Sequence, residues 1–231
     1  MFFEPGWQYR NGTAILRLRP SPDMKKPLLL FILALPLTDL LTQDMSATHI
    51  TLPVRVHLVR SAVHPRLQTS LRVPEVRAIF EEVNDIWAPA GIRFEIESVA
   101  EVEALPSPQK KWFEKDRNWV KAAIPTASFA PGAIDVCFVR EMGPNGFFYG
   151  EPVVVCENPE FTRVKGGAAN PVSRVAAHEL GHVLGLQHRQ DHVNLMASGR
   201  NGVSMNGDEI KAARQKAQSI SDVWSNRALK P

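Results

Sequence analysis

The sequence HELGHVLGLQH, which begins at His178, constrains this 231-residue chain more than any other feature. Its first two histidines, His178 and His182, are four residues apart. On a helix this spacing places both imidazoles on one face, with Cβ atoms about 5–6 Å apart. The preceding residues favour a helix, because Asn170 is a good N-cap and Pro171 fits the first helical position. We therefore expect a helix from there to about Leu184.

The same segment supplies the other groups of a metal site. Gly185 falls where the helix should end, and glycine readily adopts the positive φ that turns the chain sharply. The turn brings His188 toward the first two histidines, and three imidazoles with an open fourth position are typical of catalytic Zn²⁺. Glu179 is placed to contact a metal-bound water as a general base. The alternatives are three histidines without a metal, and a structural or degenerate metal site.

Composition narrows the class of protein. With 44% hydrophobic and 22% charged residues, the chain is neither disordered nor collagen-like. Its 27 basic residues are scattered among 24 acidic ones, so we expect no nucleic-acid partner. Two cysteines exclude a disulfide-rich scaffold and a zinc site made of cysteines alone.

A short apolar run near the N-terminus is typical of a secretory signal peptide. Lys25 and Lys26 precede it, and residues 28–37 contain no polar side chain. The run is shorter than the roughly 20 residues of a transmembrane helix, and Pro36 interrupts it. The alternative is an ordinary apolar N-terminal helix.

This pattern predicts where the folded domain begins. We expect translation to start at Met24, and residues 1–47 to comprise upstream sequence and the signal peptide. Residues 48–231 then form one monomeric domain that is secreted or periplasmic and not stably bound to a membrane. An uncleaved segment 24–47 would instead anchor the protein in a membrane.

Apolar spacing predicts the other elements. Alternating or continuous apolar residues indicate strands over 50–60, from 92, over 133–140 and over 152–156, with a turn and edge strand within 143–150. Helices are expected from Pro74 to before Pro89, over 107–123 and from Asn206. The first of these helices has one apolar face, made of Val76, Ile79, Phe80, Val83 and Trp87.

With these elements in this order, the chain resembles the metzincin metallopeptidases. The resemblance rests on His178, Glu179, His182, Gly185 and His188, and on Met196, which is similar to the methionine of the family's Met-turn, an apolar floor beneath the metal. It implies an α+β, zincin-like fold with a twisted mixed five-stranded sheet, a backing helix and an active-site helix. The upper subdomain would span about 48–187, and the small lower subdomain, about 188–231, would end in a helix.

The resemblance also implies an activity. A zinc endopeptidase of this type holds one catalytic Zn²⁺ on the three histidines and hydrolyses a peptide or protein substrate, with Glu179 as general base. The alternative is a binding module that holds zinc without cleaving, which the presence of Glu179 disfavours. Arg189, directly after the third histidine, is typical of no major metzincin family. Ser198 replaces the tyrosine ligand of astacin-like and serralysin-like members, and His192 is interpreted as a surface residue.

The substrate cleft and the cysteines complete the expectations. The resemblance implies that Gly146, Phe147, Phe148 and Tyr149 form the upper rim, where an extended peptide adds as a strand; the aromatic residues are alternatively part of the core. The strands that carry Cys137 and Cys156 would be neighbours in the sheet. A disulfide between them and two buried free thiols are both compatible with that arrangement.

Overall fold

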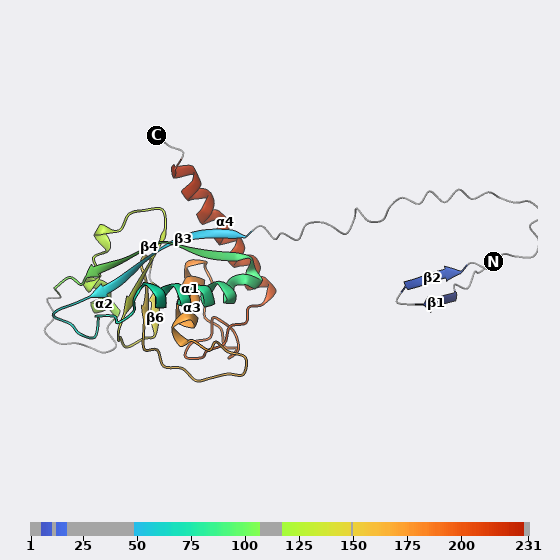
Figure 1. Cartoon of the computed structure of the whole chain (residues 1–231), viewed down its shortest axis with the longest axis horizontal. Coiled ribbons are helices and arrows are strands. Elements are labelled where there is room, and N and C mark those ends of the chain that lie inside the picture. The colour runs from blue at the N-terminus through green and yellow to red at the C-terminus, as the bar shows by residue number, and fades with distance from the viewer. Residues whose placement is uncertain (1–5, 11–12, 18–48, 107–116, 149, 229–231) are drawn as a thin grey trace, which may run out of the picture. The chain divides into compact units, whose positions relative to one another are not determined.

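The structure is a computed structural model that describes residues 6–10, 13–17, 49–106, 117–148 and 150–228 (Figure 1). Contacts divide the chain into two units, Met1–Met45 and Ser46–Pro231. The first unit contains an antiparallel hairpin of β1 (Gly6–Arg10) and β2 (Thr13–Arg17). The predicted signal peptide and start at Met24 lie outside the described residues. Among the residues that are described, no helix is both long and apolar enough to cross a membrane.

A five-stranded mixed sheet forms the centre of the second unit, as predicted. Its strand order is β4-β3-β5-β7-β6, in which the first four strands are parallel and β6 runs antiparallel to β7. The bounds are Ile50–Arg60 for β3, Ile92–Glu103 for β4, Ile134–Val139 for β5, Gly146–Phe148 for β6 and Val153–Cys156 for β7. The predicted edge strand is thus confirmed as β6.

The opposite edge of the sheet, β4, is long and irregular. Val54 of β3 pairs with Ile96, but Arg55 pairs with Ser98, so Glu97 is the extra residue of a β-bulge. The outward residues of β4 include four exposed glutamates, Glu95, Glu97, Glu101 and Glu103.

The helices agree with the sequence pattern where the structure describes them. Their bounds are Val73–Trp87 for α1, Arg117–Ala123 for α2, Pro171–Val183 for α3 and Gly207–Ala228 for α4, with short 3-10 turns at Ala88–Ala90 and Thr126–Ser128. The helix expected over 107–123 is seen from Arg117 onward, and its earlier part lies outside the described residues.

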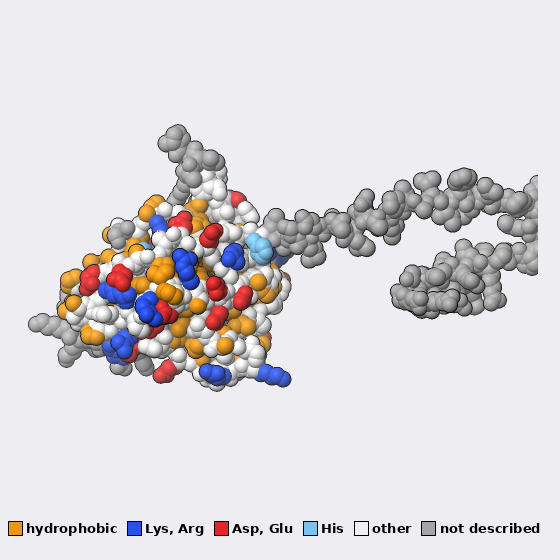
Figure 2. All heavy atoms as spheres, viewed as in Figure 1, with side chains coloured by type: hydrophobic (Ala, Val, Ile, Leu, Met, Phe, Trp, Pro, Cys, Tyr) orange, Lys and Arg blue, Asp and Glu red, His pale blue; other side chains and the backbone are white. Residues whose placement is uncertain are grey.

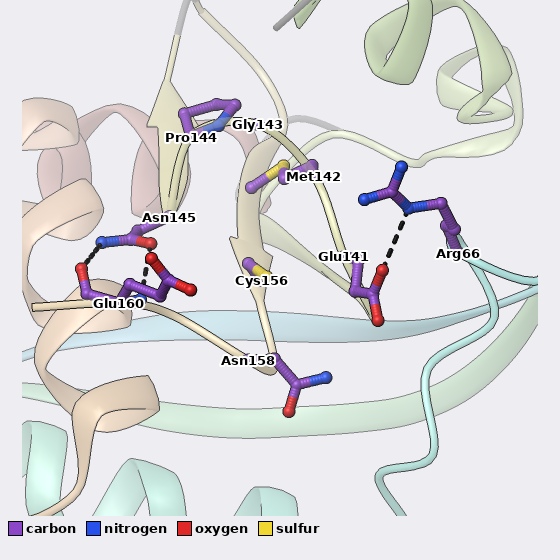
Figure 3. Close-up of a pocket in the computed structure, with 9 residues that line it drawn as sticks. All are labelled: Arg66, Glu141, Met142, Gly143, Pro144, Asn145, Cys156, Asn158 and Glu160. Atoms are coloured by element: carbon purple, nitrogen blue, oxygen red, sulfur yellow. Dashed lines mark hydrogen bonds and ion pairs between the residues drawn. The ribbon is translucent and has the colours of Figure 1, made fainter. Parts of the chain in front are cut away.

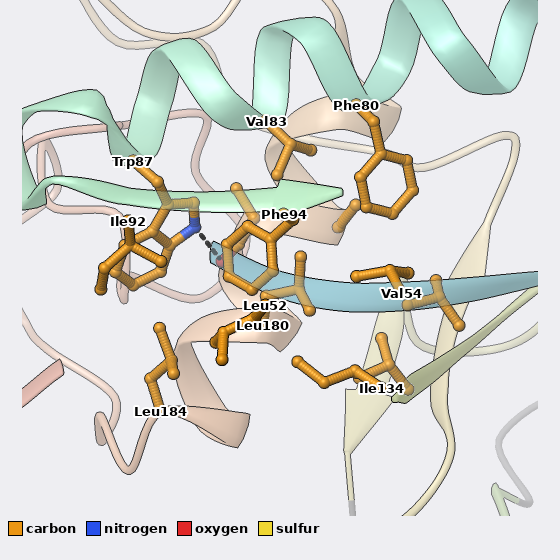
Figure 4. Packing of buried hydrophobic residues seen from close by; sticks show 14 of the residues in the cluster. Leu52, Val54, Phe80, Val83, Trp87, Ile92, Phe94, Ile134, Leu180 and Leu184 are labelled. Atoms are coloured by element: carbon orange, nitrogen blue, oxygen red, sulfur yellow. Dashed lines mark hydrogen bonds between the residues drawn. The ribbon is translucent and has the colours of Figure 1, made fainter. Parts of the chain in front are cut away.

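The main core lies between one face of the sheet and the helices α1 and α3 (Figure 4). All five residues of the predicted apolar face of α1 are buried. The largest of them, Trp87, packs edge-on against Phe94 at 6.0 Å and donates a hydrogen bond from Nε1 to the carbonyl of Ala177 at 3.2 Å. Because Ala177 precedes the first histidine of the motif, this contact fixes α3 against the core.

A smaller core lies on the other face of the sheet and contains side chains of β5 and β7, the two strands that carry the cysteines. Cys137 and Cys156 are buried free thiols. The register pairs Cys156 with Val139 and Cys137 with Val154, so the cysteines are offset by two residues on adjacent strands. At ordinary strand spacings this offset separates their Cα atoms by about 8 Å, beyond disulfide range. Of the two alternatives, the structure contains the free thiols.

The C-terminal helix closes the domain. The backbone N–H of Glu209 donates to Asn206 Oδ1 at 2.9 Å, and the N–H of Asn206 donates to Glu209 Oε2 at 2.8 Å, which is the capping box expected at this position. Arg214 Nη1 then donates to the carbonyl of Ala90 at 2.7 Å and ties α4 to the turn after α1. On the face shown in Figure 2, basic and acidic side chains are interspersed.

Candidate metal centre

The three predicted ligands converge. His178 and His182 project from α3, and His188 approaches them from beyond the helix end. Nε2 of His188 lies 3.3 Å from Nε2 of His178 and 3.1 Å from Nε2 of His182. His192, four residues further on, is exposed and outside this cluster, as expected.

These distances fit a zinc ion. Two nitrogen ligands about 2.0–2.1 Å from a tetrahedral Zn²⁺ lie about 3.4 Å from each other. The Nδ1 atoms already have partners, because His178 Nδ1 lies 2.8 Å from the carbonyl oxygen of Leu195 and His182 Nδ1 lies 2.8 Å from that of Leu186. A carbonyl only accepts, so each Nδ1 carries the proton and each Nε2 presents a lone pair to the metal.

Burial keeps the two helical ligands, His178 and His182, neutral. Desolvation, together with the nearby positive charge of Arg174, lowers the pKa of His178 to about 3. Desolvation also lowers the pKa of His182, although its bond to the Leu186 carbonyl opposes the shift. Neutral imidazole is the form that binds metal, so at neutral pH these two ligands can bind without losing a proton.

The turn that brings in the third ligand is built as the sequence predicts. Gly185 has φ +83°, a backbone conformation that residues other than glycine rarely adopt. Its N–H donates to the carbonyl of His182 at 3.0 Å, and the N–H of Leu186 donates to that of Gly181 at 2.9 Å. These bonds end α3 and direct the chain back toward the metal site.

The general-base candidate, Glu179, is 5% exposed and lies against the edge strand. A Cβ atom on Gly146 would be 2.7 Å from Glu179 Oε1, 2.8 Å from its Cγ and 2.6 Å from Val175 Cγ1. Only glycine allows β6 to approach α3 this closely. The sequence predicts Gly146 as part of the rim, but its contact with Glu179 was not foreseen.

The aromatic residues of the rim divide between two roles. Phe147 is buried in the smaller core, so for this residue the alternative interpretation holds. Phe148 is half-buried and packs against the main core. Tyr149 lies outside the described residues.

Met196 packs against the helix that carries the first two ligands. It is fully buried, and its Sδ would be 2.6 Å from a Cβ atom placed on Gly181, which precedes the ligand His182. The thioether thus contacts the backbone of α3 between the two helical ligands, and its role as a Met-turn methionine stays a prediction.

Two sets of polar contacts around Met196 were missed by sequence reasoning, although Glu209 itself was expected as the capping-box partner of Asn206. Arg174 is buried and donates to the carbonyls of Leu195 and Ala197, at 2.7 and 2.5 Å. Glu209 accepts from Arg189 Nε at 2.7 Å and from Asn194 at 2.8 Å. A signal for Arg174 exists, because a charged residue one helical turn before His178 shares its face within an otherwise apolar stretch.

A polar cavity of about 610 Å³ lies where the chain enters β6 (Figure 3). An ion pair between Arg66 and Glu141, 3.0 Å long, lines one side of it. Opposite, Asn145 is held by two bonds to the backbone of Glu160, at 2.7 and 3.0 Å. These bonds fix the residue that immediately precedes the edge strand.

Comparisons with solved structures give distant likenesses. A chain of a chaperone–substrate complex has 15% identity and a TM-score of 0.47; the match covers 77% of this chain, which spans only 36% of that one. An archaemetzincin from Methanopyrus kandleri has 14% identity and a TM-score of 0.40 and covers 80% of this chain and 98% of its own. Metalloproteinase-II from Bacteroides fragilis has 11% identity and a TM-score of 0.37, with coverage of 72% and 52%. No curated protein matches the sequence.

The family comparison is more specific. The matrixin family model matches residues 103–223, more than half of the chain, and the match includes all three histidines. It confirms the metzincin resemblance and identifies the family within the metzincins, which the residue after the third histidine had not indicated. This chain therefore belongs to the matrixin family of zinc metallopeptidases, and its three converging histidines form the catalytic zinc site.

Proposed function

We propose that this protein is an exported endopeptidase that cleaves internal bonds of peptide or protein substrates. The observation that carries the proposal is the buried carboxylate of Glu179, which follows the ligand His178 directly on α3, together with the three converging imidazoles. A carboxylate at that place serves as a base for a water molecule, whereas a structural metal site needs none.

The residues of the chain divide the chemistry between them. Zinc held by the three histidines supplies Lewis-acid activation of the scissile carbonyl and of a water molecule. Glu179 accepts the proton of the attacking water at its carboxylate and delivers it to the leaving amine. The bonds from His178 and His182 to backbone carbonyls keep their imidazoles oriented throughout.

The edge strand offers a place for the substrate backbone. β6 pairs with β7 on one side, and no other strand among the described residues pairs with its second side. An extended peptide can add there as a further strand, with main-chain hydrogen bonds that do not depend on its sequence. Because Gly146 contacts Glu179, a peptide on this edge passes close to the general base.

Export is proposed from the sequence of residues 24–47, with its two lysines and apolar run. Intact-mass measurement of the protein recovered outside the cytoplasm tests it. A mass that lacks these residues supports a cleaved signal peptide, whereas a full-length mass in the membrane fraction supports an uncleaved anchor.

The activity is tested with the purified full chain and a mixed peptide pool, with cleavage read by mass spectrometry. Glu179→Gln should abolish cleavage and retain zinc, measured by elemental analysis. Glu81→Gln, at an exposed position of α1, is the matched control and should cleave like wild type. Cleavage that persists in Glu179→Gln would contradict the mechanism. A folded, zinc-loaded wild type that leaves every peptide intact would favour the binding-module alternative.

A further inference from the structure

We propose that Arg174 is a positioning residue of the metal centre. Its guanidinium holds the two carbonyl groups on either side of Met196 and, through the Leu195 carbonyl, sets the position of the His178 imidazole. The inference deepens the proposed function but rests on it only through the metal centre, so metal affinity tests it separately from peptide cleavage.

The geometry of Arg174 is that of a clamp. It lies one helical turn before His178 on α3, so the two side chains leave the same face of the helix. Nη2 donates to the carbonyls of Leu195 and Ala197, at 2.7 and 2.5 Å, and Nε donates to that of Gly202 at 3.3 Å. One side chain therefore fixes three points of the loop that follows the third ligand.

The Leu195 carbonyl links this clamp to the metal ligand. It accepts from Arg174 Nη2 at 2.7 Å and also lies 2.8 Å from His178 Nδ1. The carbonyl oxygen thus accepts from both the guanidinium and the ligand imidazole. When the guanidinium is removed, the carbonyl can move, and the imidazole that depends on it loses its fixed orientation.

Arg174 is a buried cation, and the cost of burying its charge indicates that the residue serves to position other groups. The residue is 2% exposed, and burial lowers the pKa of its guanidinium to about 10, opposed by the negative charge of Glu179. It therefore stays protonated at neutral pH. A phenyl ring, that of Phe161, lies 5.4 Å from the guanidinium carbon and offsets part of the cost of burial.

Charge and position predict opposite effects on metal binding. A buried cation repels Zn²⁺, so a residue that acted only through its charge would weaken binding, and its removal would strengthen it. A residue that orients a ligand does the reverse. The sign of the change in zinc affinity therefore distinguishes the two roles.

The experiment compares zinc affinities of the full chain by competition with a chelator at neutral pH, on samples whose folding is checked by circular dichroism. Arg174→Met should weaken zinc binding by about 10- to 100-fold, the usual cost of losing a group that orients a metal ligand. Arg174→Lys keeps the charge but has one nitrogen in place of the Nε and Nη2 donors that together hold three carbonyls, and should fall between that variant and wild type. The Co²⁺-substituted variants should also show altered d–d absorption bands.

Arg214→Met is the matched control. Arg214 Nη1 also donates to two carbonyls, those of Ala90 and Gly91, at 2.7 and 3.3 Å, but between α4 and the turn after α1. Its loss should lower stability without changing zinc affinity.

Unchanged or tighter zinc binding in folded Arg174→Met would overturn the proposal. If that variant does not fold, wild-type affinity in Arg174→Lys would overturn it equally. Weakened zinc binding in the variants, together with a wild type that cleaves no peptide, would support this inference while the proposed activity fails.

Discussion

Replacing Gly146 by alanine should impair catalysis by displacing Glu179. The added Cβ atom would lie 2.6 Å from Val175 Cγ1, 2.8 Å from Glu179 Cγ and 2.7 Å from Glu179 Oε1. Carbon atoms in contact are normally about 3.5–4.0 Å apart, so the overlap is about 1 Å. Val175 cannot easily turn away, because a β-branched side chain in a helix has one strongly preferred rotamer. Glu179 or the strand must therefore move.

The size of the effect follows from that overlap. Overpacking of a well-filled site costs about 1–3 kcal/mol of stability. A displacement of about 1 Å in a catalytic group costs about 100-fold in rate, and if strand and side chain share the movement the loss is about 10-fold. We expect kcat/KM of Gly146→Ala to fall between these limits, while zinc content stays that of wild type, because the three atoms nearest to the added Cβ belong to Val175 and Glu179 and not to a ligand.

Steady-state cleavage of one peptide from the pool measures the effect. Loss in kcat indicates displacement of Glu179, whereas a rise in KM alone indicates displacement of the edge strand. Gly207→Ala is the control, since a Cβ atom there has no atom within 4 Å. A folded Gly146→Ala protein with wild-type kcat would refute the argument, because it would show that the two elements separate without moving the general base.

Three further predictions concern metal, thiols and acid stability. His188→Ala removes one of three nitrogen ligands and should lower zinc affinity sharply in a chelator competition; unchanged zinc content would reject His188 as a ligand. A thiol reagent should modify neither Cys137 nor Cys156 in the native protein but both after denaturation without reductant, whereas a disulfide would leave no reactive thiol. Burial raises the pKa of Glu209, but bonds from the Asn206 backbone, Asn194 and Arg189 outweigh it and lower the pKa below its usual value. The ionised carboxylate therefore stabilises the fold above about pH 4.3, and this stabilisation is lost as the pH falls through the lowered pKa. Glu209→Gln should lower the free energy of unfolding in urea at pH 7 by about 1–3 kcal/mol. The variant should also lose less stability than wild type as the pH falls, and a pH profile identical to that of wild type would contradict this.

The sequence predicted best those features that depend on neighbours along the chain. The apolar face of α1, the helix end at Gly185 and the capping box at Asn206 each follow from residues a few positions apart, and each is present. The three histidines were predictable for the same reason, because a helix and one turn suffice to bring them together.

The features that were missed depend on contacts between distant segments. Gly146 was predicted to be a rim residue. Only the packing of β6 on α3 shows that a residue without a side chain is needed there to make room for Glu179. Arg174 was not predicted as a site residue. Its partners are the backbone carbonyls of Leu195 and Ala197, which lie beyond the third ligand and whose side chains are apolar. Backbone carbonyls leave no trace in a sequence, so the sequence can mark Arg174 as a charged residue in an apolar stretch but cannot name its partners.

The two edges of the sheet differ in what they allow a foreign strand to do. Along β4, a negatively charged side chain projects at Glu95, Glu97, Glu101 and Glu103, and the bulge at Glu97 breaks the regular row of backbone donors and acceptors. Charges and bulges at an exposed edge hinder the pairing that leads to aggregation. If substrates add to β6 as proposed, the sheet is thereby protected from growing into fibrils at its other side.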